Sequence, residues 1–249
     1  MARPLEHQVA LVTGATQGIG RAIAMALADA GARVWINHLD QPQAAEALVA
    51  QIVAGGGSAQ AVQADVASAE QVEAMFVEVL GDGPLDILVN NAGIILEKAF
   101  LDTDEDDWAR LLGVDLGGVY RCCRQALAHM QPRGTGSIVN IASELGQLGR
   151  ARYVAYCTAK AGVIGLSKSL AREFAPAIRI NAVAPGPVDT PMVSLEHMSA
   201  EMIAAETAIP AGRLGRPEEI AAAVLFLVSP QASFFHGQTL GANGGAWMG

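Results

Sequence analysis

Tyr156 and Lys160 are the residues whose types and spacing most clearly suggest chemistry. They lie four positions apart in the segment YCTAK, and on a helix such residues project from the same face. A free phenol loses its proton only near pH ~10, but a neighbouring ammonium group favours the phenolate and lowers that pKa. A tyrosine tuned in this way can exchange a proton with an alcohol or carbonyl oxygen at near-neutral pH.

The alternative is a chance pair on a helix surface, and Ser143 decides against it. Ser143 ends the strand-like segment GSIVNIAS (136–143), so we expect its hydroxyl to reach the same crevice as Tyr156. There it can hydrogen-bond a substrate oxygen as charge develops. Tyr153 is a poorer candidate, because the residue four positions later is Cys157, which supplies no charge. The sequence therefore predicts proton exchange between Tyr156 and an alcohol or carbonyl oxygen that Ser143 helps to hold.

The elements that must position these residues alternate between two kinds of segment. Strand-like runs occupy 8–14, 33–37, 58–66, 86–93, 136–143, 179–186 and 237–242. Alanine-rich helical stretches occupy 19–30, 43–54, 69–80, 104–130, 152–174 and 217–228. Apolar runs that alternate with helical patterns indicate βαβ units and a parallel sheet covered on both faces. We predict a single α/β domain over 1–249, a doubly wound three-layer sandwich.

Composition narrows the function further. Hydrophobic residues make up 51% of the chain, which suits a buried sheet and not disorder. The net charge of −9, without a basic block, disfavours nucleic acid and anionic membranes as partners. The longest apolar run, 220–228, is too short to cross a bilayer, and the N-terminus lacks a signal-peptide layout, so we expect a cytoplasmic protein. Three cysteines without a CxxC pair, and scattered histidines, make a metal site unexpected.

Residues 187–219 interrupt the alternation, because they follow a strand but lead to no immediate next strand. We predict an inserted lobe of one or two helices. Long excursions in compact domains are often lids or binding loops, and this one leaves the carboxyl end of a strand, where ligands bind in such sheets. A surface helix pair is the alternative.

A glycine-rich turn, TGATQGIG (13–20), joins the first strand to the first helix. Gly14, Gly18 and Gly20 permit a tight turn, close approach to a pyrophosphate and close helix packing, and the helix directs its free N–H groups at the phosphates. An acidic residue at the end of the second strand would favour NAD and an arginine NADP. That position reads Asn37 and His38, with Asp40 nearby, which gives a slight preference for NADP.

These segments, together with NNAG (90–93) and APGPVDTPM (184–192), closely resemble the short-chain dehydrogenase/reductase family in type and order. The resemblance spans essentially the whole chain and implies a Rossmann-type fold, a nicotinamide-dependent oxidoreductase acting on a small molecule and, commonly, a homotetramer. It implies cofactor contacts from Thr13, Gly14, Gln17, Gly18, Ile19, Gly20, Asn37, His38, Asp65, Val66, Asn91, Ala92, Gly93, Tyr156, Lys160, Pro185, Gly186, Val188 and Thr190. It also implies that Ser143 and Tyr156 hold the substrate oxygen while Lys160 lowers the tyrosine pKa and anchors the nicotinamide ribose.

Asp115, in GVDLGGVY (113–120), departs from the family, which usually has asparagine there. That asparagine helps to kink its helix and connects through water to the lysine. An aspartate can preserve the kink, while its carboxylate would favour the charged form of Lys160. We therefore include Asp115 among the catalytic candidates. Asn140 lies mid-strand and is interpreted as structural.

The substrate is the least determined feature. The segment after Ser143 offers polar contacts through Glu144, Gln147, Arg150 and Arg152, which favour a sugar, polyol or hydroxy acid unless these side chains face solvent. A 3-oxoacyl-carrier-protein reductase is the alternative enzyme. It should carry a basic patch for its acidic carrier, for which the candidates are Arg121, Arg124 and Arg172. A dinucleotide-binding protein without catalysis is the alternative outside enzymes.

Overall fold

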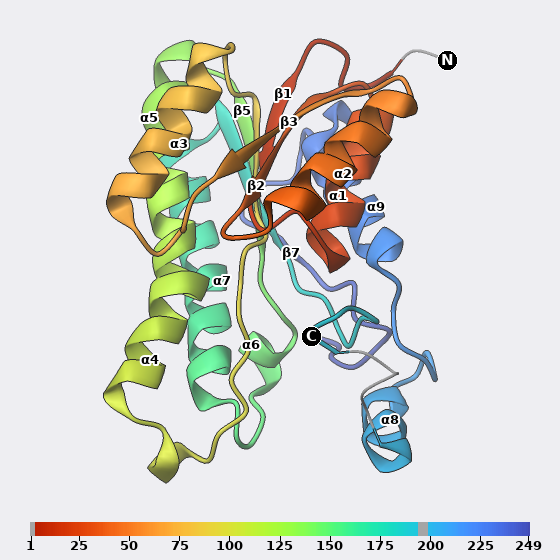
Figure 1. Ribbon diagram of the computed structural model, residues 1–249. Coiled ribbons are helices and arrows are strands. Elements are labelled where there is room, and N and C mark those ends of the chain that lie inside the picture. Colours follow the sequence, from red (N-terminus) through yellow and green to blue (C-terminus); the bar gives the residue numbers. More distant parts are fainter. Residues whose placement is uncertain (1–2, 194–198) are drawn as a thin grey trace.

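Seven parallel strands form one sheet in the computed structural model, which describes residues 3–193 and 199–249 (Figure 1). They are β1 (Val9–Val12), β2 (Arg33–His38), β3 (Ser58–Gln63), β4 (Ile87–Asn90), β5 (Gly136–Ile141), β6 (Ile178–Val183) and β7 (Thr239–Leu240). Their order is β3-β2-β1-β4-β5-β6-β7, so the direction of growth reverses between β1 and β4. Ligands bind at such a reversal, beyond the carboxyl ends of the strands.

Helices cover both faces of the sheet. They are α1 (Gly18–Asp29), α2 (Pro42–Ala54), α3 (Ala69–Gly81), α4 (Glu105–Leu112), α5 (Val119–Arg133), α6 (Leu145–Leu148), α7 (Val154–Phe174), α8 (Ala200–Thr207) and α9 (Pro217–Val228), with short 3-10 turns η1 (Phe100–Asp102) and η3 (Pro230–Ala232). One face packs against α1, α2 and α9 and the other against α3, α5 and α7 (Figure 1). The predicted three-layer, Rossmann-type sandwich is confirmed.

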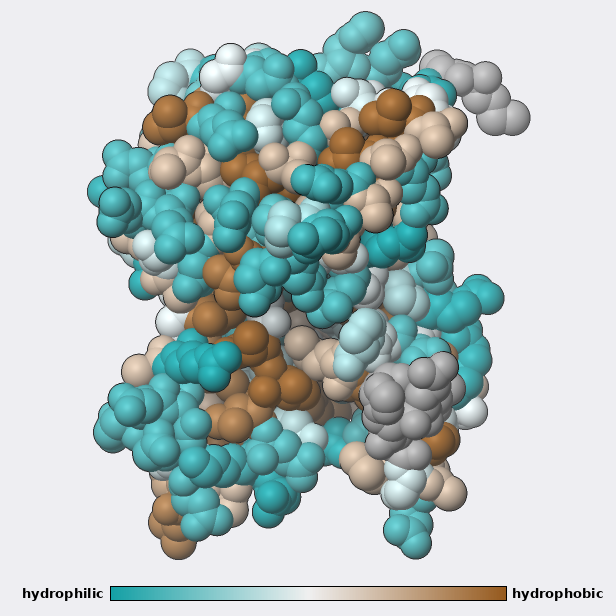
Figure 2. All heavy atoms as spheres, viewed as in Figure 1, coloured by the Kyte–Doolittle hydropathy of each residue, from teal (hydrophilic) through white to brown (hydrophobic). Residues whose placement is uncertain are grey.

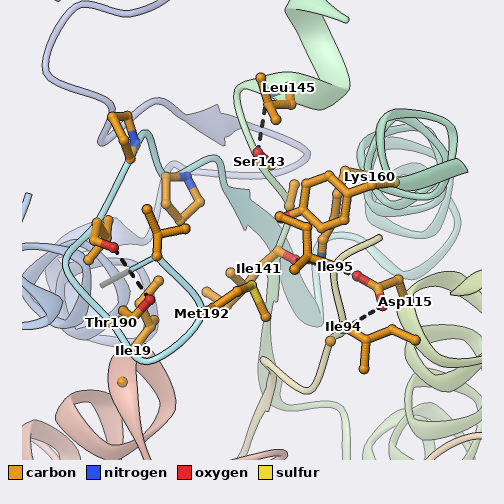
Figure 3. A pocket seen from close by; sticks show the side chains of 18 of the residues that line it. Ile19, Ile94, Ile95, Asp115, Ile141, Ser143, Leu145, Lys160, Thr190 and Met192 are labelled. Atoms are coloured by element: carbon orange, nitrogen blue, oxygen red, sulfur yellow. Dashed lines mark hydrogen bonds and ion pairs between the residues drawn. The ribbon is translucent and has the colours of Figure 1, made fainter. Parts of the chain in front are cut away.

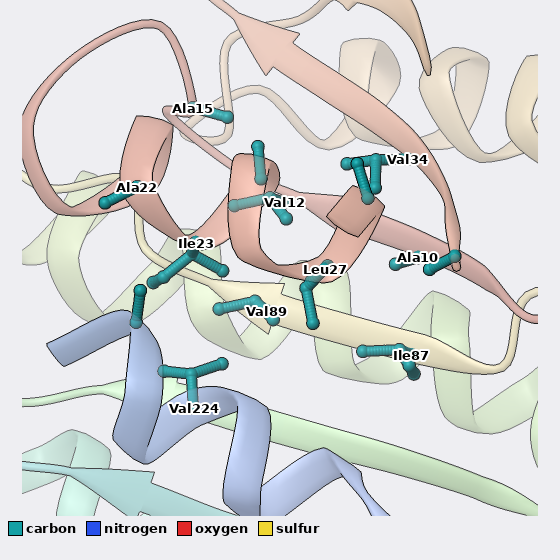
Figure 4. Close-up of a cluster of buried hydrophobic side chains, with 14 of the residues drawn as sticks. Ala10, Val12, Ala15, Ala22, Ile23, Leu27, Val34, Ile87, Val89 and Val224 are labelled. Carbon is teal, nitrogen blue, oxygen red and sulfur yellow. The ribbon is translucent and has the colours of Figure 1, made fainter. Parts of the chain in front are cut away.

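The core consists of two apolar layers, one on each side of the sheet. On one side, Val12 of β1 and Val89 of β4 pack against Ile23 of α1 and Val224 of α9 (Figure 4). Leu11, the neighbour of Val12, faces the opposite layer, because successive strand side chains point to opposite faces. Both faces are thus removed from water, which explains why the central strands read as uninterrupted apolar runs.

The predicted helix over 104–130 is interrupted by a π-helical turn, η2 (Gly113–Gly118), between α4 and α5. This turn holds Asp115, whose side chain is completely buried. Single π turns inside helices are rare and occur frequently at functional sites. The expected distortion at Asp115 is therefore present as a change of helical pitch.

The excursion at 187–219 leaves the three layers after β6. Its described part contains α8, which projects beyond the carboxyl edge of the sheet (Figure 1). Ser199 is the N-cap of α8, because its hydroxyl oxygen accepts a hydrogen bond of 3.2 Å from the Met202 N–H. Residues 194–198 of the predicted lobe lie outside the described residues. Among the helices described, none has the length and apolar character needed to cross a membrane.

Candidate active site

A cavity of about 450 Å³ lies at the carboxyl edge of the sheet, beyond the ends of β1, β4, β5 and β6. Figure 2 shows the surface hollowed here, with apolar side chains gathered inside. The cavity lining contains most of the residues expected to act in catalysis or cofactor binding. The four catalytic candidates all line it, namely Asp115, Ser143, Tyr156 and Lys160. The expected cofactor contacts in the lining are Gly14, Gln17, Gly18, Ile19, Gly20, Asn91, Ala92, Gly93, Pro185, Gly186, Val188 and Thr190. The strand order thus gathers segments that are far apart in sequence.

The glycine-rich turn forms one end of this cavity. Gly14 and Gly18 have φ values of +60° and +51°, a left-handed conformation that glycine adopts without strain. A Cβ at Gly20 would lie 2.4 Å from both the Gly14 oxygen and Asn91 Nδ2, so a side chain there would displace the turn. Gln17 precedes α1, and within the described residues no side chain caps this helix. Its first N–H groups are thus available to an anion.

Thr13 and Asn91 tie the turn to the neighbouring strand. Thr13 Oγ1 accepts hydrogen bonds of 3.0 Å from the N–H groups of Asn91 and Ala92. Asn91 Nδ2 donates in return to the carbonyl oxygens of Thr13, at 3.0 Å, and Gly14, at 2.9 Å. These four contacts fix the spacing of β1 and β4 where the sheet order reverses. Thr13 and Asn91 therefore shape the cofactor crevice from below.

The residues present fit a nicotinamide dinucleotide. A Cβ on Gly18 would lie 3.2 Å from Thr190 Cγ2, and one on Gly93 would lie 3.3 Å from Lys160 Nζ, so side chains at either glycine would narrow the cavity. The free N–H groups of α1 suit the phosphates at one end. Lys160 suits the hydroxyl groups of a ribose at the other end.

Ser143, Tyr156 and Lys160 converge as predicted. Ser143 lies two residues beyond β5 and is buried; its Oγ accepts a hydrogen bond of 3.1 Å from the Leu145 N–H (Figure 3). Tyr156 and Lys160 lie one turn apart on α7, and Lys160 Nζ is 5.5 Å from the centre of the Tyr156 ring. The hydroxyl, the phenol and the ammonium group line one wall of the same cavity.

Tyr156 titrates differently from the sequence-based expectation. Burial raises its pKa above the ordinary value of 10. Lys160 lowers that pKa, as expected, but Asp115 raises it again, and the net direction is upward. Lys160 thus acts on the phenol in the expected direction, but burial, which residue spacing does not reveal, has the larger effect on the pKa. At neutral pH Tyr156 is therefore a phenol that can donate its proton.

Asp115 forms a buried ion pair with Lys160. Asp115 Oδ2 is 3.1 Å from Lys160 Nζ, and the two side chains are 0% and 5% exposed. Asp115 Oδ1 accepts a hydrogen bond of 2.8 Å from the Ile94 N–H, and Lys160 also donates to the Ile141 oxygen at 3.2 Å (Figure 3). Burial lowers the pKa of Lys160, but Asp115 and Tyr156 more than offset this, so the pKa is raised and the lysine stays charged.

The segment after β6 closes the far side of the cavity. Gly186 passes so close to Asn243 that a Cβ would lie 2.7 Å from the Asn243 Cα atom. The Val188 side chain is buried, and the Thr190 hydroxyl donates to the Val188 oxygen at 3.4 Å. Pro185, Gly186, Val188 and Thr190 thus face the glycine-rich turn across the cavity, where the resemblance places the nicotinamide.

Four of the expected adenosine contacts lie outside this cavity lining. Asn37 is buried, and its amide bonds to the Gly14 N–H and the Ala64 oxygen, so it supports the turn from behind. His38 is also buried, and its Nδ1 accepts from the Gln41 N–H at 3.3 Å. Asp65 Oδ1 accepts from the Ala67 N–H, and the Val66 side chain packs in the core. Asn37 and His38 end β2, and Asp65 and Val66 follow β3, so all four lie at the carboxyl edge on the β2–β3 side of the sheet.

The substrate wall contains charged groups that only the folded chain brings together. Glu144 and Arg150, two of the four polar candidates, line the cavity. Arg150 pairs with Glu206 of α8 at 2.5 Å. Arg152 instead pairs with Glu97 at the surface, and Gln147 is absent from the lining.

Sequence reasoning assigned no role to a further set of lining residues, namely Ile94, Ile95, Glu97, Met192, Met202 and Glu206, and it set Tyr153 aside, although Tyr153 also lines the cavity. The apolar members follow directly after NNAG or lie in the 187–219 excursion. The only sign in the sequence that these apolar residues line the cavity was that they lie next to motifs already assigned to the site.

This fold and site define a class of protein, and comparison with known families agrees. The family model described as enoyl-(acyl carrier protein) reductase matches residues 14–246. The chain belongs to the short-chain dehydrogenase/reductase family and is an NAD(P)-dependent oxidoreductase acting on alcohol or keto groups.

Particular relatives have a more specific name. The 3-oxoacyl-[acyl-carrier-protein] reductase of Synechocystis sp. is 42% identical over 247 residues, covering 98% of each chain. The reductase FabG of Staphylococcus aureus is 42% identical over 243 residues, covering 96% of this chain and 98% of the relative. Similar solved structures include a dehydrogenase/reductase from Sinorhizobium meliloti 1021, which is 35% identical with a TM-score of 0.94. The match covers 99% of this chain and 98% of that one. An actinorhodin polyketide ketoreductase variant with NADPH is 35% identical with a TM-score of 0.91, and the match covers 99% of this chain and 100% of that one.

Proposed function

We propose that this chain reduces the keto group of a 3-oxoacyl thioester to the 3-hydroxy form, with NADPH as reductant. The observation that carries the proposal is the 42% identity to a 3-oxoacyl-carrier-protein reductase over 98% of both chains. NADPH is preferred to NADH because a solved relative contains it and because positions 37 and 38 lack a carboxylate for the ribose.

The chain's own residues suit reduction. The keto oxygen accepts hydrogen bonds from Ser143 and Tyr156, which polarise the carbonyl as negative charge develops. When bound, the cofactor is the source of the hydride that the keto carbon receives. Tyr156 donates its proton to the oxygen, which completes the alcohol. Lys160, held charged by Asp115, stabilises the phenolate that remains.

Other features of the cavity favour an acyl substrate. Ile94, Ile95 and Met192 provide an apolar lining near the proposed reaction centre (Figure 3). Of the candidate carrier contacts, Arg124 and Arg172 are exposed, while Arg121 donates to the Val66 and Gly113 oxygens. A sugar, polyol or hydroxy acid, the first expectation from the sequence, is the second candidate. The charged Glu144, Arg150 and Glu206 in the lining favour it, but the relatives support it less well.

Two further features belong to the same proposal. Residues 187–219 act as a substrate lid, since Met202 and Glu206 of α8 line the cavity. The chain works as a homotetramer, in which α5 and α7 pack across a two-fold axis. A shallow cavity of about 290 Å³ on these helices, lined by Leu127, Leu166 and Leu170 among others, suits such packing. A solution mass equal to one chain contradicts the assembly.

A cofactor-linked absorbance assay tests the reaction. We expect NADPH oxidation with a short 3-oxoacyl thioester at a kcat/KM on the order of 100-fold above that with keto sugars, oxidised polyols or keto acids. Tyr156→Phe should lower kcat by roughly 10²–10⁴-fold, because it removes the proton donor, while the Kd for NADPH stays within about threefold. Equal or faster reduction of a keto sugar, an oxidised polyol or a keto acid contradicts the proposed 3-oxoacyl substrate. NADPH binding without turnover across the panel favours a non-catalytic protein.

A further inference from the structure

Glu144 is a buried carboxyl group that the proposed reaction does not yet use. It follows Ser143 directly, its side chain is only 7% exposed, and it lines the cavity. Among the described residues, Glu144 Oε2 has no hydrogen-bond partner. A buried polar atom without a partner costs free energy, and native proteins nearly always satisfy such atoms. Glu144 is therefore a polar group of the cavity wall whose hydrogen-bonding capacity the chain itself leaves partly unused.

The surroundings of Glu144 make its neutral form accessible near neutral pH. Burial raises its pKa to about 7 and Glu206 of α8 adds to the rise, while the backbone N–H of Glu144, Arg150 and the Ser143 hydroxyl lower it. Its backbone N–H is fixed by a hydrogen bond of 3.0 Å to the Pro185 oxygen. The ionised carboxylate also raises the pKa of Tyr156, and both residues line the same cavity. A neutral carboxyl carries one O–H donor, which pairs with a carbonyl oxygen.

We propose that protonated Glu144 donates a hydrogen bond to a second carbonyl of the substrate, the thioester carbonyl two carbons from the keto group. The inference rests on the proposed function, because a 3-oxoacyl thioester carries that second carbonyl. Consecutive Cα atoms are about 3.8 Å apart. Ser143 and Glu144 can therefore address two carbonyl groups that one methylene separates. Glu144 thus distinguishes a 3-oxoacyl thioester from a simple ketone.

Two variants separate this role from its rivals. Glu144→Gln keeps the shape of the side chain and offers an N–H donor at every pH. Glu144→Leu removes both donor and acceptor. For the parent and both variants, kcat/KM is measured from pH 6 to pH 9 with the N-acetylcysteamine thioester of 3-oxobutanoate and with 2-heptanone, and the ratio of the two values is compared. The simple ketone cancels pH effects that arise at Tyr156 or Lys160.

We expect the parent ratio to fall by roughly tenfold between pH 6 and pH 9, because the donor is lost as Glu144 ionises. Glu144→Gln should hold a high ratio at every pH, and Glu144→Leu a ratio roughly tenfold below the parent value at pH 6. Thermal unfolding of each variant verifies that it is folded.

The outcomes separate the two proposals. If the parent reduces the thioester but all three proteins share one ratio, only the assignment of Glu144 is overturned. A ratio for Glu144→Gln as low as that of Glu144→Leu also overturns it, and indicates an ionised Glu144 that accepts from a hydroxyl or ammonium group. If the parent reduces ketones but no 3-oxoacyl thioester, the proposed function fails and the inference with it.

Discussion

Two ion pairs border the same cavity in opposite environments. The floor pair joins Lys160 to Asp115 at 3.1 Å, with side chains 5% and 0% exposed. The rim pair joins Arg150 to Glu206 at 2.5 Å, with side chains 39% and 18% exposed. Water screens the exposed rim pair far more than the buried floor pair. Removing one partner of each pair should therefore change the free energy of unfolding by different amounts.

The two pairs also differ in what holds them. The floor pair is anchored to backbone groups, through the Ile94 N–H and the Ile141 oxygen, so its geometry is fixed when the sheet forms. The rim pair connects the segment before α7 to α8, and within the described part of the chain no backbone group anchors it in this way. From this difference we propose that the floor pair sets the acidity of Tyr156 and that the rim pair places α8 over the substrate.

The largest effect is expected from Asp115→Ala. Removing one partner of a buried pair leaves the Lys160 charge uncompensated, and the Ile94 N–H loses its acceptor. We expect the free energy of unfolding to fall by about 3–5 kcal/mol, measured by urea denaturation. Asp115→Asn is the matched control and should cost less, because its amide oxygen still accepts from Ile94. A loss under about 1 kcal/mol for the alanine variant would mean that the floor pair is no more important than the rim pair.

The pH dependence of the reaction rate in Asp115→Asn tests whether the floor pair sets the pKa of Tyr156. Asp115 raises the pKa of Tyr156, so an uncharged residue there lowers that pKa. Alcohol oxidation needs the phenolate and rises with pH through the tyrosine pKa, and keto reduction needs the phenol and falls through it. Both limbs of the pH–rate profile should therefore move to lower pH.

Asp82→Asn is the control for this pH shift. It breaks a pair with Arg33 at the opposite edge of the sheet and should leave the limbs unchanged. Superimposable profiles for the parent and Asp115→Asn would confine Asp115 to a structural role.

The parts of the site that could be predicted from sequence are those fixed by strand ends and helix spacing. Ser143 follows β5, the glycine-rich turn follows β1, and Tyr156 and Lys160 lie one turn apart on α7. A parallel sheet collects all carboxyl ends at one edge, so the order of motifs was sufficient to bring these residues together. The central strands were found because each is an apolar run between helical patterns, while β3 and β7, which mix polar and apolar residues, were found from their place in the alternation.

The remaining features depend on burial and on contacts between distant segments. No local pattern relates Arg150 to Glu206, and the net pKa of Tyr156 follows from how deeply α7 packs. Glu144 was identified only as a polar wall residue, because its unpartnered oxygen is a property of the folded cavity. The departure at Asp115 was visible in the sequence, but its direct contact with Lys160 needed the π-helical turn.

The smallest effect is expected from Arg150→Gln, which breaks the rim pair. Half-exposed pairs contribute about 0–1 kcal/mol, so the unfolding free energy should change by no more than that. Because α8 loses its link to the wall, we expect KM for the 3-oxoacyl thioester to rise severalfold while kcat stays within about twofold. Arg150 also lowers the pKa of Glu144, so the fall in substrate selectivity attributed to Glu144 should move to higher pH.

Arg213→Gln is the matched control, since Arg213 pairs with Glu219 at 2.6 Å outside the cavity lining and is also half-exposed. It should leave KM and the selectivity profile at the parent values. If Arg150→Gln instead lowers kcat as strongly as Asp115→Asn, the rim pair takes part in the chemistry, and the separation between a floor that sets acidity and a rim that places the substrate is wrong. If both arginine variants raise KM alike, the effect does not come from the rim pair.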